Sequence, residues 1–106
     1  MCGIAGFIDY PATVAPYIHE VAGIQRHRGP DHQALWQKEG VALCHQRLSI
    51  IDLSAAANQP MMRDRLVIVY NGELYNYREL RARLEKEQNV TFTTESDTEV
   101  ILAAYR

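Results

Sequence analysis

The pattern of hydrophobic and polar residues divides the first third of the chain into a strand and a short helix. Apolar residues on both faces of segment 2–9 predict a strand buried between two layers. Pro11 ends this strand, and Pro16 suits the first turn of a helix that closes at Gly29 and Pro30. The apolar residues that predict this helix are three or four positions apart: Tyr17, Ile18, Val21 and Ile24.

The middle of the chain is typical of extended structure. Two runs at 34–36 and 41–44, separated by a glycine-containing segment at 38–40, predict a hairpin. Segment 52–65 has no sustained period of either kind, so we expect a long loop there. The clearest strand covers 66–70, where apolar residues are continuous and an Asn-Gly pair follows as a turn signal.

The last third predicts a helix, a strand and a second helix. Apolar residues at helical spacing indicate an amphipathic helix from Leu74 to about Glu87, and Asn89 marks its end. Segment 90–94 alternates and is rich in threonine, which indicates a strand. A Ser-x-x-Glu capping box at 96–99 then begins a helix that runs to the last residue. The order of elements is that of a mixed α+β chain.

The composition limits the partners and the chemistry. The 106 residues suit one domain, and 13 acidic against 11 basic side chains give a net charge of −2, which offers no basic surface to a nucleic acid. No apolar run reaches the length of a membrane span and no signal-peptide pattern opens the sequence, so we expect a cytoplasmic protein without a membrane partner. Two cysteines are too few for a disulfide framework, and four histidines at irregular spacing do not indicate a metal site.

Cys2 is the candidate nucleophile. Removal of Met1 would place its thiol and a free α-amine on one Cα atom, and such an amine, with a pKa of roughly 8, takes up the thiol proton near neutral pH. The small Gly3 leaves room for the approach of substrate and backbone. The alternative is that a cysteine before a buried strand is only a small apolar residue, and the first residues taken alone favour that alternative.

The wider sequence carries motifs that decide between these interpretations. The chain resembles the class II glutamine amidotransferase domain of asparagine synthetases in six motifs that follow in the same order. They are Met-Cys-Gly-Ile-Ala-Gly at 1–6, Arg-His-Arg-Gly-Pro-Asp at 26–31, His-Gln-Arg-Leu-Ser-Ile-Ile-Asp-Leu-Ser at 45–54, Asn-Gln-Pro-Met at 58–61, Tyr-Asn-Gly-Glu-Leu-Tyr-Asn-Tyr at 70–77 and Ser-Asp-Thr-Glu-Val at 96–100. The resemblance favours a catalytic Cys2.

The resemblance implies the hydrolysis of glutamine to glutamate and ammonia through a γ-glutamyl thioester on Cys2. It assigns the contacts to the oxyanion to the side-chain amide of Asn71 and the backbone N–H of Gly72, which are donors of the kind that a tetrahedral intermediate requires. The alternative for this pair is an Asn-Gly turn selected only for its backbone angles.

The resemblance also assigns partners to the charged groups of glutamine. Arg47 would bind the α-carboxylate with its planar fork, and Asp97, with Glu73 as a second contributor, would bind the α-ammonium. Backbone contacts would come from Leu48 and Ile50. The alternatives are an exposed arginine at a strand end, an acid favoured by the first turn of a helix, and a solvated glutamate in a turn.

The implied fold is an αββα sandwich of the N-terminal-nucleophile hydrolase type, incomplete in this chain. From the resemblance we expect residues 1–106 to be the front part of a type 2 amidotransferase domain, truncated in its last helix. No metal or cofactor is expected in these residues, because ATP and Mg²⁺ belong to a synthetase domain that they lack. The expected partners are glutamine, that synthetase domain and a second copy of the chain. The alternative function is a catalytically silent fragment or interaction module, with a bound metal as a distant third.

Three further expectations concern burial and loops. The side chains that we expect to be buried are Ile4, Phe7, Val67, Val69 and Leu80. We expect segment 26–31 to form a structured loop near the site without a catalytic role. We also expect Cys44 to add a second thiol near the pocket.

Overall fold

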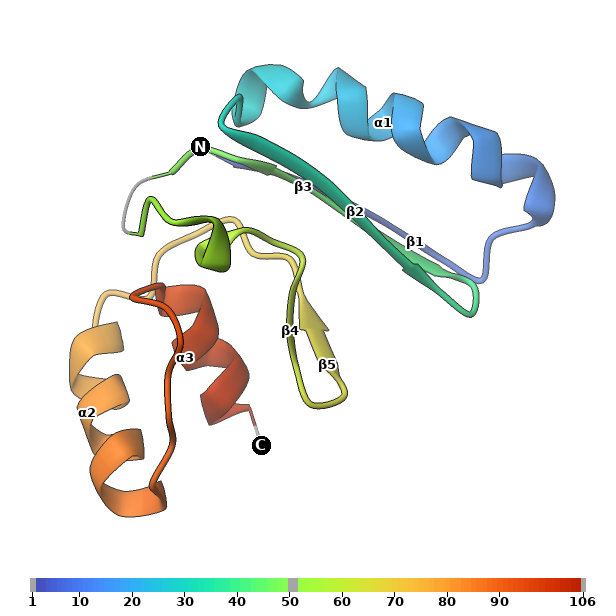
Figure 1. Ribbon diagram of the computed structural model, residues 1–106. Helices are drawn as coiled ribbons and strands as arrows, with labels where there is room; N and C mark the ends of the chain where they lie inside the picture. The colour runs from blue at the N-terminus through green and yellow to red at the C-terminus, as the bar shows by residue number, and fades with distance from the viewer. Residues whose placement is uncertain (1, 50–51, 106) are drawn as a thin grey trace.

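The computed structural model describes residues 2–49 and 52–105, which form two lobes in an elongated molecule of 48 × 28 × 19 Å (Figure 1). The first lobe is a three-stranded antiparallel sheet in the order β1-β3-β2, with a helix across one face. Its elements are β1 (Gly3–Ile8), α1 (Ile18–Ile24), β2 (His32–Lys38) and β3 (Val41–Arg47).

The second lobe contains a two-stranded antiparallel sheet and two helices. Its elements are β4 (Met61–Arg63), β5 (Leu66–Ile68), α2 (Tyr77–Gln88) and α3 (Asp97–Ala104). None of the described helices is long and apolar enough to cross a membrane. The two lobes together confirm a mixed α+β fold built on antiparallel sheets.

The predicted hairpin is confirmed, and it is longer than the sequence pattern indicates. β2 and β3 pair over their full length, and the turn between them consists of Glu39 and Gly40. Both turn residues have positive φ angles, +47° and +79°, which is the geometry of a two-residue turn that matches the twist of the strands. The N–H of Asp9 donates to the carbonyl of Gly40 at 2.8 Å, so β1 ends against the same turn.

Helix α1 covers one face of this sheet. Side chains alternate along β3, and Ala42, Cys44 and Gln46 face the helix, where Gln46 Nε2 donates to the carbonyl of Ala22. The first buried cluster consists of Ile18, Ala22, Ala42 and Cys44. Burial there raises the pKa of the Cys44 thiol. Our prediction that Cys44 lies near the pocket is wrong, because the alternation of β3 turns it away from Arg47 and beneath α1.

The predicted helix before the hairpin forms in three pieces. The 3₁₀ segments η1 (Ala12–Tyr17) and η2 (Arg26–Arg28) flank α1, and Pro16 lies within η1. A proline lacks the N–H that a longer α-helix would need at this point, so the regular helix begins only after it.

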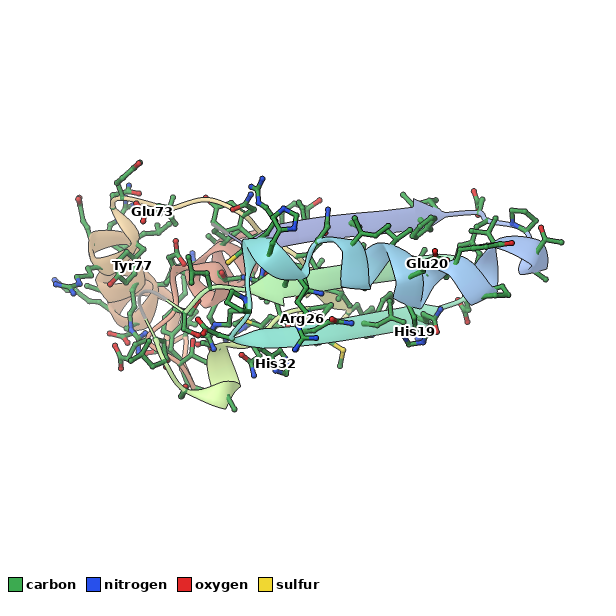
Figure 2. All side chains as sticks on the ribbon, turned by 90° about the horizontal axis from the view of Figure 1, so that it is seen from above. His19, Glu20, Arg26, His32, Glu73 and Tyr77 are labelled. Carbon is green, nitrogen blue, oxygen red and sulfur yellow. The ribbon has the colours of Figure 1, made fainter. Side chains whose placement is uncertain are left out.

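The opposite face of the sheet is open over most of its length. Figure 2 shows Glu73 and Tyr77 of the second lobe beyond one end of the strands rather than along them. Ile4 and Ile8 on β1 are 41% and 75% exposed, so the prediction that Ile4 is buried is wrong. No second layer covers these positions within the part of the chain that the structure describes. The other side chains that we expected to be buried are half-buried: Phe7, Val67, Val69 and Leu80.

The second hairpin lies partly where we expected a loop. Within segment 52–65 the structure has a 3₁₀ turn, η3 (Ala55–Ala57), and strand β4, which pairs with β5. A three-residue strand is too short to produce a visible alternation in the sequence, which is why the pattern failed to predict it. The predicted strand at 66–70 is also shorter, because β5 ends at Ile68, which pairs with Met61, the first residue of its partner β4.

Helices α2 and α3 form the second buried cluster. It consists of Leu84, Val100 and Ala103, with Leu80 and Phe92 packed against it. Both helix ends that the sequence marks are confirmed. Asn89 has a left-handed φ of +54° and ends α2, and the Ser96 side chain accepts a hydrogen bond from Thr98 N at 3.1 Å as the cap of α3.

Segment 90–94 is not a strand, which contradicts our prediction. Within the described residues it pairs with no strand, and the carboxylate of Glu99 binds two of its N–H groups instead. Glu99 accepts hydrogen bonds from the N–H groups of Thr93 and Thr94, both at 2.8 Å, and from their hydroxyls at 3.1 and 2.7 Å. The acid of the capping box therefore binds this loop rather than the Ser96 amide.

Segment 26–31 is a structured loop that packs against the end of β3. A Cβ atom on Gly29 would overlap the backbone carbonyl of Gln46, so the two segments touch through their main chains. The N–H of Asp31 donates to Arg47 O at 2.9 Å, and the Asp31 carboxylate accepts from Ser49 N at 2.7 Å. The loop thus fixes the chain on both sides of Leu48.

Replacement of Gly29 by alanine should lower the free energy of unfolding by roughly 1 to 3 kcal/mol, because the added methyl group overlaps backbone that cannot rotate away. Gly23→Ala is the matched control, since a Cβ there meets no atom within 4 Å and lies in a helix, where it should stabilise by up to about 1 kcal/mol. Urea unfolding of the two variants measures the difference. Equal stability of the two variants would show that the Gly29 contact is not close.

Glu99→Gln should lower the free energy of unfolding by roughly 2 to 4 kcal/mol, because an amide nitrogen cannot accept the hydrogen bonds that one carboxylate oxygen receives. Glu85→Gln, an exposed partner of Arg81, serves as the control and should cost less than about 1 kcal/mol.

The same carboxylate predicts acid sensitivity. Burial raises the pKa of Glu99, but the hydrogen bonds from Thr93 and Thr94 outweigh burial and hold that pKa below its ordinary value. A group with a lowered folded pKa stabilises fully above its unfolded pKa, and this stability is lost as the pH falls through the folded pKa. The difference in stability between the parent and Glu99→Gln should therefore shrink below about pH 4.5. A constant difference down to pH 2 would contradict this assignment.

Candidate functional site

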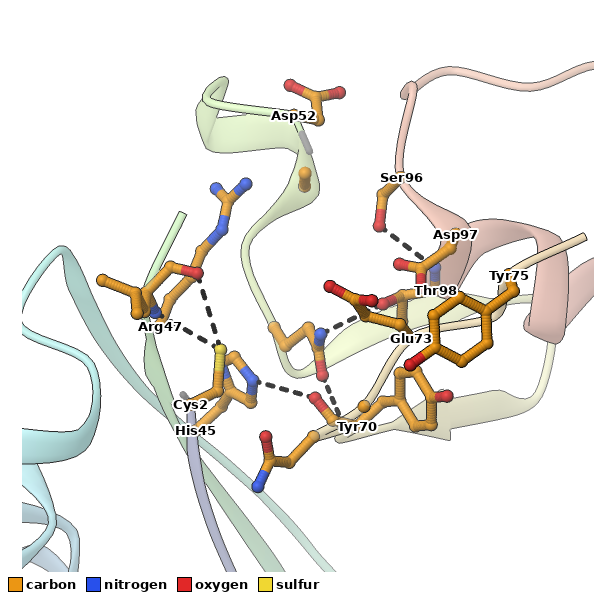
Figure 3. A pocket seen from close by; sticks show the side chains of 15 residues that line it. Cys2, His45, Arg47, Asp52, Tyr70, Glu73, Tyr75, Ser96, Asp97 and Thr98 are labelled. Carbon is orange, nitrogen blue, oxygen red and sulfur yellow. Dashed lines mark hydrogen bonds between the residues drawn. The ribbon is translucent and has the colours of Figure 1, made fainter. Parts of the chain in front are cut away.

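A pocket of about 370 Å³ is lined by residues of both lobes. It receives side chains from the end of the first sheet, from the loop before β4, from the segment after β5 and from the start of α3 (Figure 3). The structure brings together seven of the eight residues that the sequence predicts for the site, namely Cys2, Arg47, Leu48, Asn71, Gly72, Glu73 and Asp97. The eighth, Ile50, lies outside the described residues.

Cys2 enters the pocket from the start of β1. Its half-buried side chain lies against the main chain of Leu48, whose N–H donates to Cys2 Sγ at 3.3 Å. The same sulfur lies 3.7 Å from the carbonyl oxygen of Leu48. The contact that we predicted for the Leu48 backbone is one with glutamine, which stays a prediction; in the structure this backbone contacts the candidate nucleophile and orients its sulfur at the wall of the pocket. Figure 3 shows Cys2 there.

Arg47 is the last residue of β3 and is buried, with 7% of its surface exposed. Its Nη1 donates to Ser54 O and to Asn58 Oδ1, both at 2.7 Å, which fixes one side of the guanidinium. Among the described residues no carboxylate lies within ion-pair distance of it. The alternative of an exposed arginine at a strand end is therefore wrong.

Asp97 lies in the first turn of α3 and is also buried, with 6% exposed. Its Oδ2 accepts a hydrogen bond from Leu74 N at 2.9 Å, and the helix N-terminus favours its negative charge. No Lys, Arg or His in the described part of the chain forms an ion pair with it. Glu73 is exposed and borders the same pocket.

Asn71 and Gly72 lie in the irregular segment between β5 and α2. The φ angle of Gly72 is outside the left-handed region, so the glycine is not there for its backbone angles. Its missing side chain instead makes room for Tyr70, because a Cβ on Gly72 would lie 2.9 Å from the Tyr70 hydroxyl. Because Gly72 has no side chain, its N–H is not shielded by one.

The sequence analysis missed several residues that line the pocket, including His45, Gln59 and Tyr70. His45 is 1% exposed, and its Nε2 lies 3.3 Å from the carbonyl of Tyr70. Burial lowers the pKa of His45, and Arg47 and His32 lower it further, against the raising effect of the Tyr70 carbonyl. A signal was present, since His45 is two residues before Arg47 and the alternation of a strand puts both on one face.

The pKa values of two other residues that line the pocket, Tyr70 and Asp52, are also shifted. Burial, followed by the negative charge of Asp97, raises the pKa of the Tyr70 phenol, which stays protonated at neutral pH. Hydrogen bonds from Ser54 and from the Glu95 N–H lower the pKa of Asp52, which stays ionised. No group of three or more His, Cys, Asp or Glu side chains in the described ranges is arranged to hold a metal ion.

The arrangement combines a thiol, a carboxamide donor, one buried cation and one buried anion around a single small cavity. A molecule that carries both a positive and a negative group would compensate the two buried charges at once. The cavity is of the size that holds a small metabolite.

Comparisons with known proteins identify relatives of this chain. Residues 1–106 match a family described as "Glutamine amidotransferase domain". The chain is 39% identical to asparagine synthetase B (glutamine-hydrolyzing) of Escherichia coli over 111 residues, which cover 100% of this chain and 20% of that protein. It is 41% identical to asparagine synthetase 1 of Bacillus subtilis and to asparagine synthetase 1 of Arabidopsis thaliana, covering 100% and 99% of this chain and 18% of each relative. The chain thus spans about a fifth of the length of these relatives.

Proposed function

This chain belongs to the glutamine amidotransferase family, and we propose that its pocket binds glutamine and that Cys2 hydrolyses it to glutamate and ammonia. One observation carries the proposal: Arg47 and Asp97 are both buried, neither has an ionic partner among the described residues, and both line the pocket that contains Cys2.

The two buried charges support an amino acid as the ligand. A buried charge without a partner is costly, so each of these side chains has a strong preference for an opposite charge in the pocket. Arg47 keeps Nη2 and Nε for a bidentate contact with the α-carboxylate, because both of its hydrogen-bond acceptors among the described residues bind Nη1. Asp97, with Glu73 beside the opening, takes the α-ammonium.

The proposed reaction starts with attack of Cys2 Sγ on the side-chain carboxamide carbon of glutamine. The α-amine of Cys2, free once Met1 has been removed, accepts the thiol proton. The oxygen that gains negative charge accepts hydrogen bonds from the Asn71 amide and the Gly72 N–H. The proton then passes to the departing nitrogen, ammonia leaves, and water hydrolyses the γ-glutamyl thioester to release glutamate and restore the thiol.

The wider role that we propose is the glutaminase half of a glutamine-dependent asparagine synthetase. The support is the similarity to asparagine synthetases over the whole of this chain. Formation of asparagine, with the ATP and Mg²⁺ that it needs, belongs to the synthetase domain of such a longer protein. A reducing, cytoplasmic compartment would suit this chemistry, since it keeps Cys2 as a thiol.

The open face of the first sheet favours a second candidate, a catalytically silent interaction module. Ile4 and Ile8 are exposed there, and such an apolar face is suited to a covering layer from the N-terminal-nucleophile hydrolase sandwich or from a second copy. Hydrolysis of glutamine by the parent, lost in Cys2→Ala, separates the glutaminase from this candidate.

Removal of either charged partner should weaken the binding of glutamine. In a Cys2→Ala background, which cannot consume the ligand, Arg47→Ala and Asp97→Asn should each cost about 2 to 5 kcal/mol, or at least about 30-fold in Kd. Arg47→Lys should also bind poorly, because a point charge cannot replace the fork. Asp97→Asn keeps an oxygen that can accept the hydrogen bond from Leu74 N, so weaker binding in this variant reports the removal of the negative charge.

Isothermal titration calorimetry measures these constants, and Arg65→Ala, which removes an exposed arginine from the turn between β4 and β5, is the control. Kd values for Arg47→Ala and Asp97→Asn equal to that of the control would refute the assigned site.

Catalysis should depend on removal of Met1. A peptide bond on Cys2 replaces the amine by an amide that cannot accept the thiol proton, which should slow hydrolysis by about 100- to 10,000-fold. A glutamine-like electrophile should label Cys2 quickly in the processed protein and slowly where Met1 is retained. Cys44 should stay unlabelled in both, because it is buried beneath α1. Peptide mass spectrometry reads both sites, and equal labelling of Cys2 in the two samples would remove the α-amine from the mechanism.

A further inference from the structure

The segment that carries the proposed oxyanion donors is held by side chains rather than by strand pairing. β5 ends at Ile68, so Tyr70 lies beyond the ladder. His45 Nε2 contacts the carbonyl of Tyr70 at 3.3 Å, and Gln59 Oε1 accepts a hydrogen bond from Tyr70 N. At the other end, Asp97 Oδ2 accepts from Leu74 N at 2.9 Å. These three side chains come from three different segments of the chain. Figure 3 shows His45 and Asp97 on either side of Tyr70.

Each of the two contacts with the Tyr70 backbone restricts a whole peptide group and not a single atom. A peptide unit is planar, so a hydrogen bond to Tyr70 N orients the plane before Tyr70, and one to Tyr70 O orients the plane after it. With both planes restricted, the φ and ψ angles of Tyr70 are restricted too. The second plane includes the N–H of Asn71, so the direction in which the chain enters Asn71 and Gly72 is determined by His45 and Gln59 together.

We propose that His45 and Gln59 are positioning residues of the hydrolytic site, which set the place of Asn71 and Gly72 relative to Cys2 through the two peptide groups of Tyr70. The inference rests on the proposed function of the pocket. It concerns two residues that act on Tyr70 and touch no substrate atom in the proposed reaction.

The chemistry of His45 suits this role. A carbonyl oxygen only accepts hydrogen bonds, so the Nε2 that faces Tyr70 O carries the proton and Nδ1 does not. Nδ1 is buried and has no hydrogen-bond partner among the described residues, so a second proton there would be unsatisfied. The ring therefore acts as a neutral, fixed donor. Because β3 alternates, the strand that ends in Arg47 also places this donor.

Gln59 extends the connection to the opposite wall of the pocket. It is 7% exposed, and while its Oε1 accepts from Tyr70 N, its Nε2 donates to Thr98 Oγ1 at 3.1 Å. Thr98 follows Asp97 in the first turn of α3. The Tyr70 backbone is thereby tied to β3 on one side and to the helix that carries Asp97 on the other.

The kinetic test compares His45→Leu, His45→Gln and Gln59→Leu with the parent. His45→Leu and Gln59→Leu should each lower kcat for glutamine hydrolysis by about 10- to 100-fold, because small displacements of positioned donors have effects of this size. Glutamine binding in a Cys2→Ala background should change less than about threefold. His45→Gln should restore most of kcat, since its amide nitrogen reaches the place of Nε2.

Gln46→Leu is the matched control. Gln46 is equally buried on the same strand and also donates to a backbone carbonyl, that of Ala22, but it points to the other face of the sheet. This variant should lower the melting temperature and leave kcat within about threefold of the parent. An unchanged kcat in His45→Leu, or an equal loss in His45→Leu, His45→Gln and Gln46→Leu, would overturn the positioning role.

A second measurement does not depend on catalysis. The backbone amide resonances of Asn71 and Gly72 in ¹H–¹⁵N spectra should shift in His45→Leu and Gln59→Leu, return towards the parent in His45→Gln and stay in place in Gln46→Leu. A parent that hydrolyses no glutamine would refute the proposed function, yet these resonances would still decide the positioning role. Unmoved Asn71 and Gly72 resonances in both leucine variants would overturn it.

Discussion

The alternation of side chains along β3 is the constraint on which both lobes depend. This central strand pairs with β1 and β2, so each of its side chains faces either α1 or the side of the second lobe. Cys44 and Gln46 face the helix and complete the first core, whereas His45 and Arg47 face the pocket. A shift of one residue in register would exchange the two sets and would bury the site residues beneath α1. The core and the pocket are therefore specified by the same hydrogen-bonded ladder.

The backbone of the second lobe is stabilised in a different way, because this lobe has little regular sheet. Buried side chains satisfy the irregular backbone there: Glu99 binds the amides of Thr93 and Thr94, and Asp97 binds that of Leu74. Hydrogen bonds to ionised acceptors are stronger than those between neutral groups, so a few of them hold a segment that has no neighbouring strand. Because both acceptors belong to the first turn of α3, the loops next to the pocket depend on the start of this helix.

Sequence patterns predicted the parts of this fold that arise from local periodicity. The hairpin with its Glu39-Gly40 turn, the Asn89 helix end and the Ser96 cap each have a signal within a few residues. The failures concern long-range partners. Segment 90–94 has the composition of a strand but has a carboxylate for a partner, and Ile4 is apolar without a layer to cover it. The motifs predicted which residues gather at the pocket. The alternation of β3 could also have placed His45 beside Arg47, but no sequence pattern indicates that His45 and Gln59 contact the backbone of Tyr70.

The position of the pocket between the lobes links binding to the fold. Arg47 belongs to the sheet lobe and Asp97 to the helical lobe, so an amino acid that pairs with both charges bridges the two. Each lobe has only a small core, and near the pocket the contact of His45 with the Tyr70 carbonyl joins the two lobes, while Gln59 ties Tyr70 to Thr98 within the helical lobe. The same bonds therefore set two geometries: the separation of the charged groups that select a zwitterion, and the place of the proposed oxyanion donors relative to the thiol. In this arrangement selection of the substrate and alignment of the reacting groups are consequences of one set of contacts across the lobes.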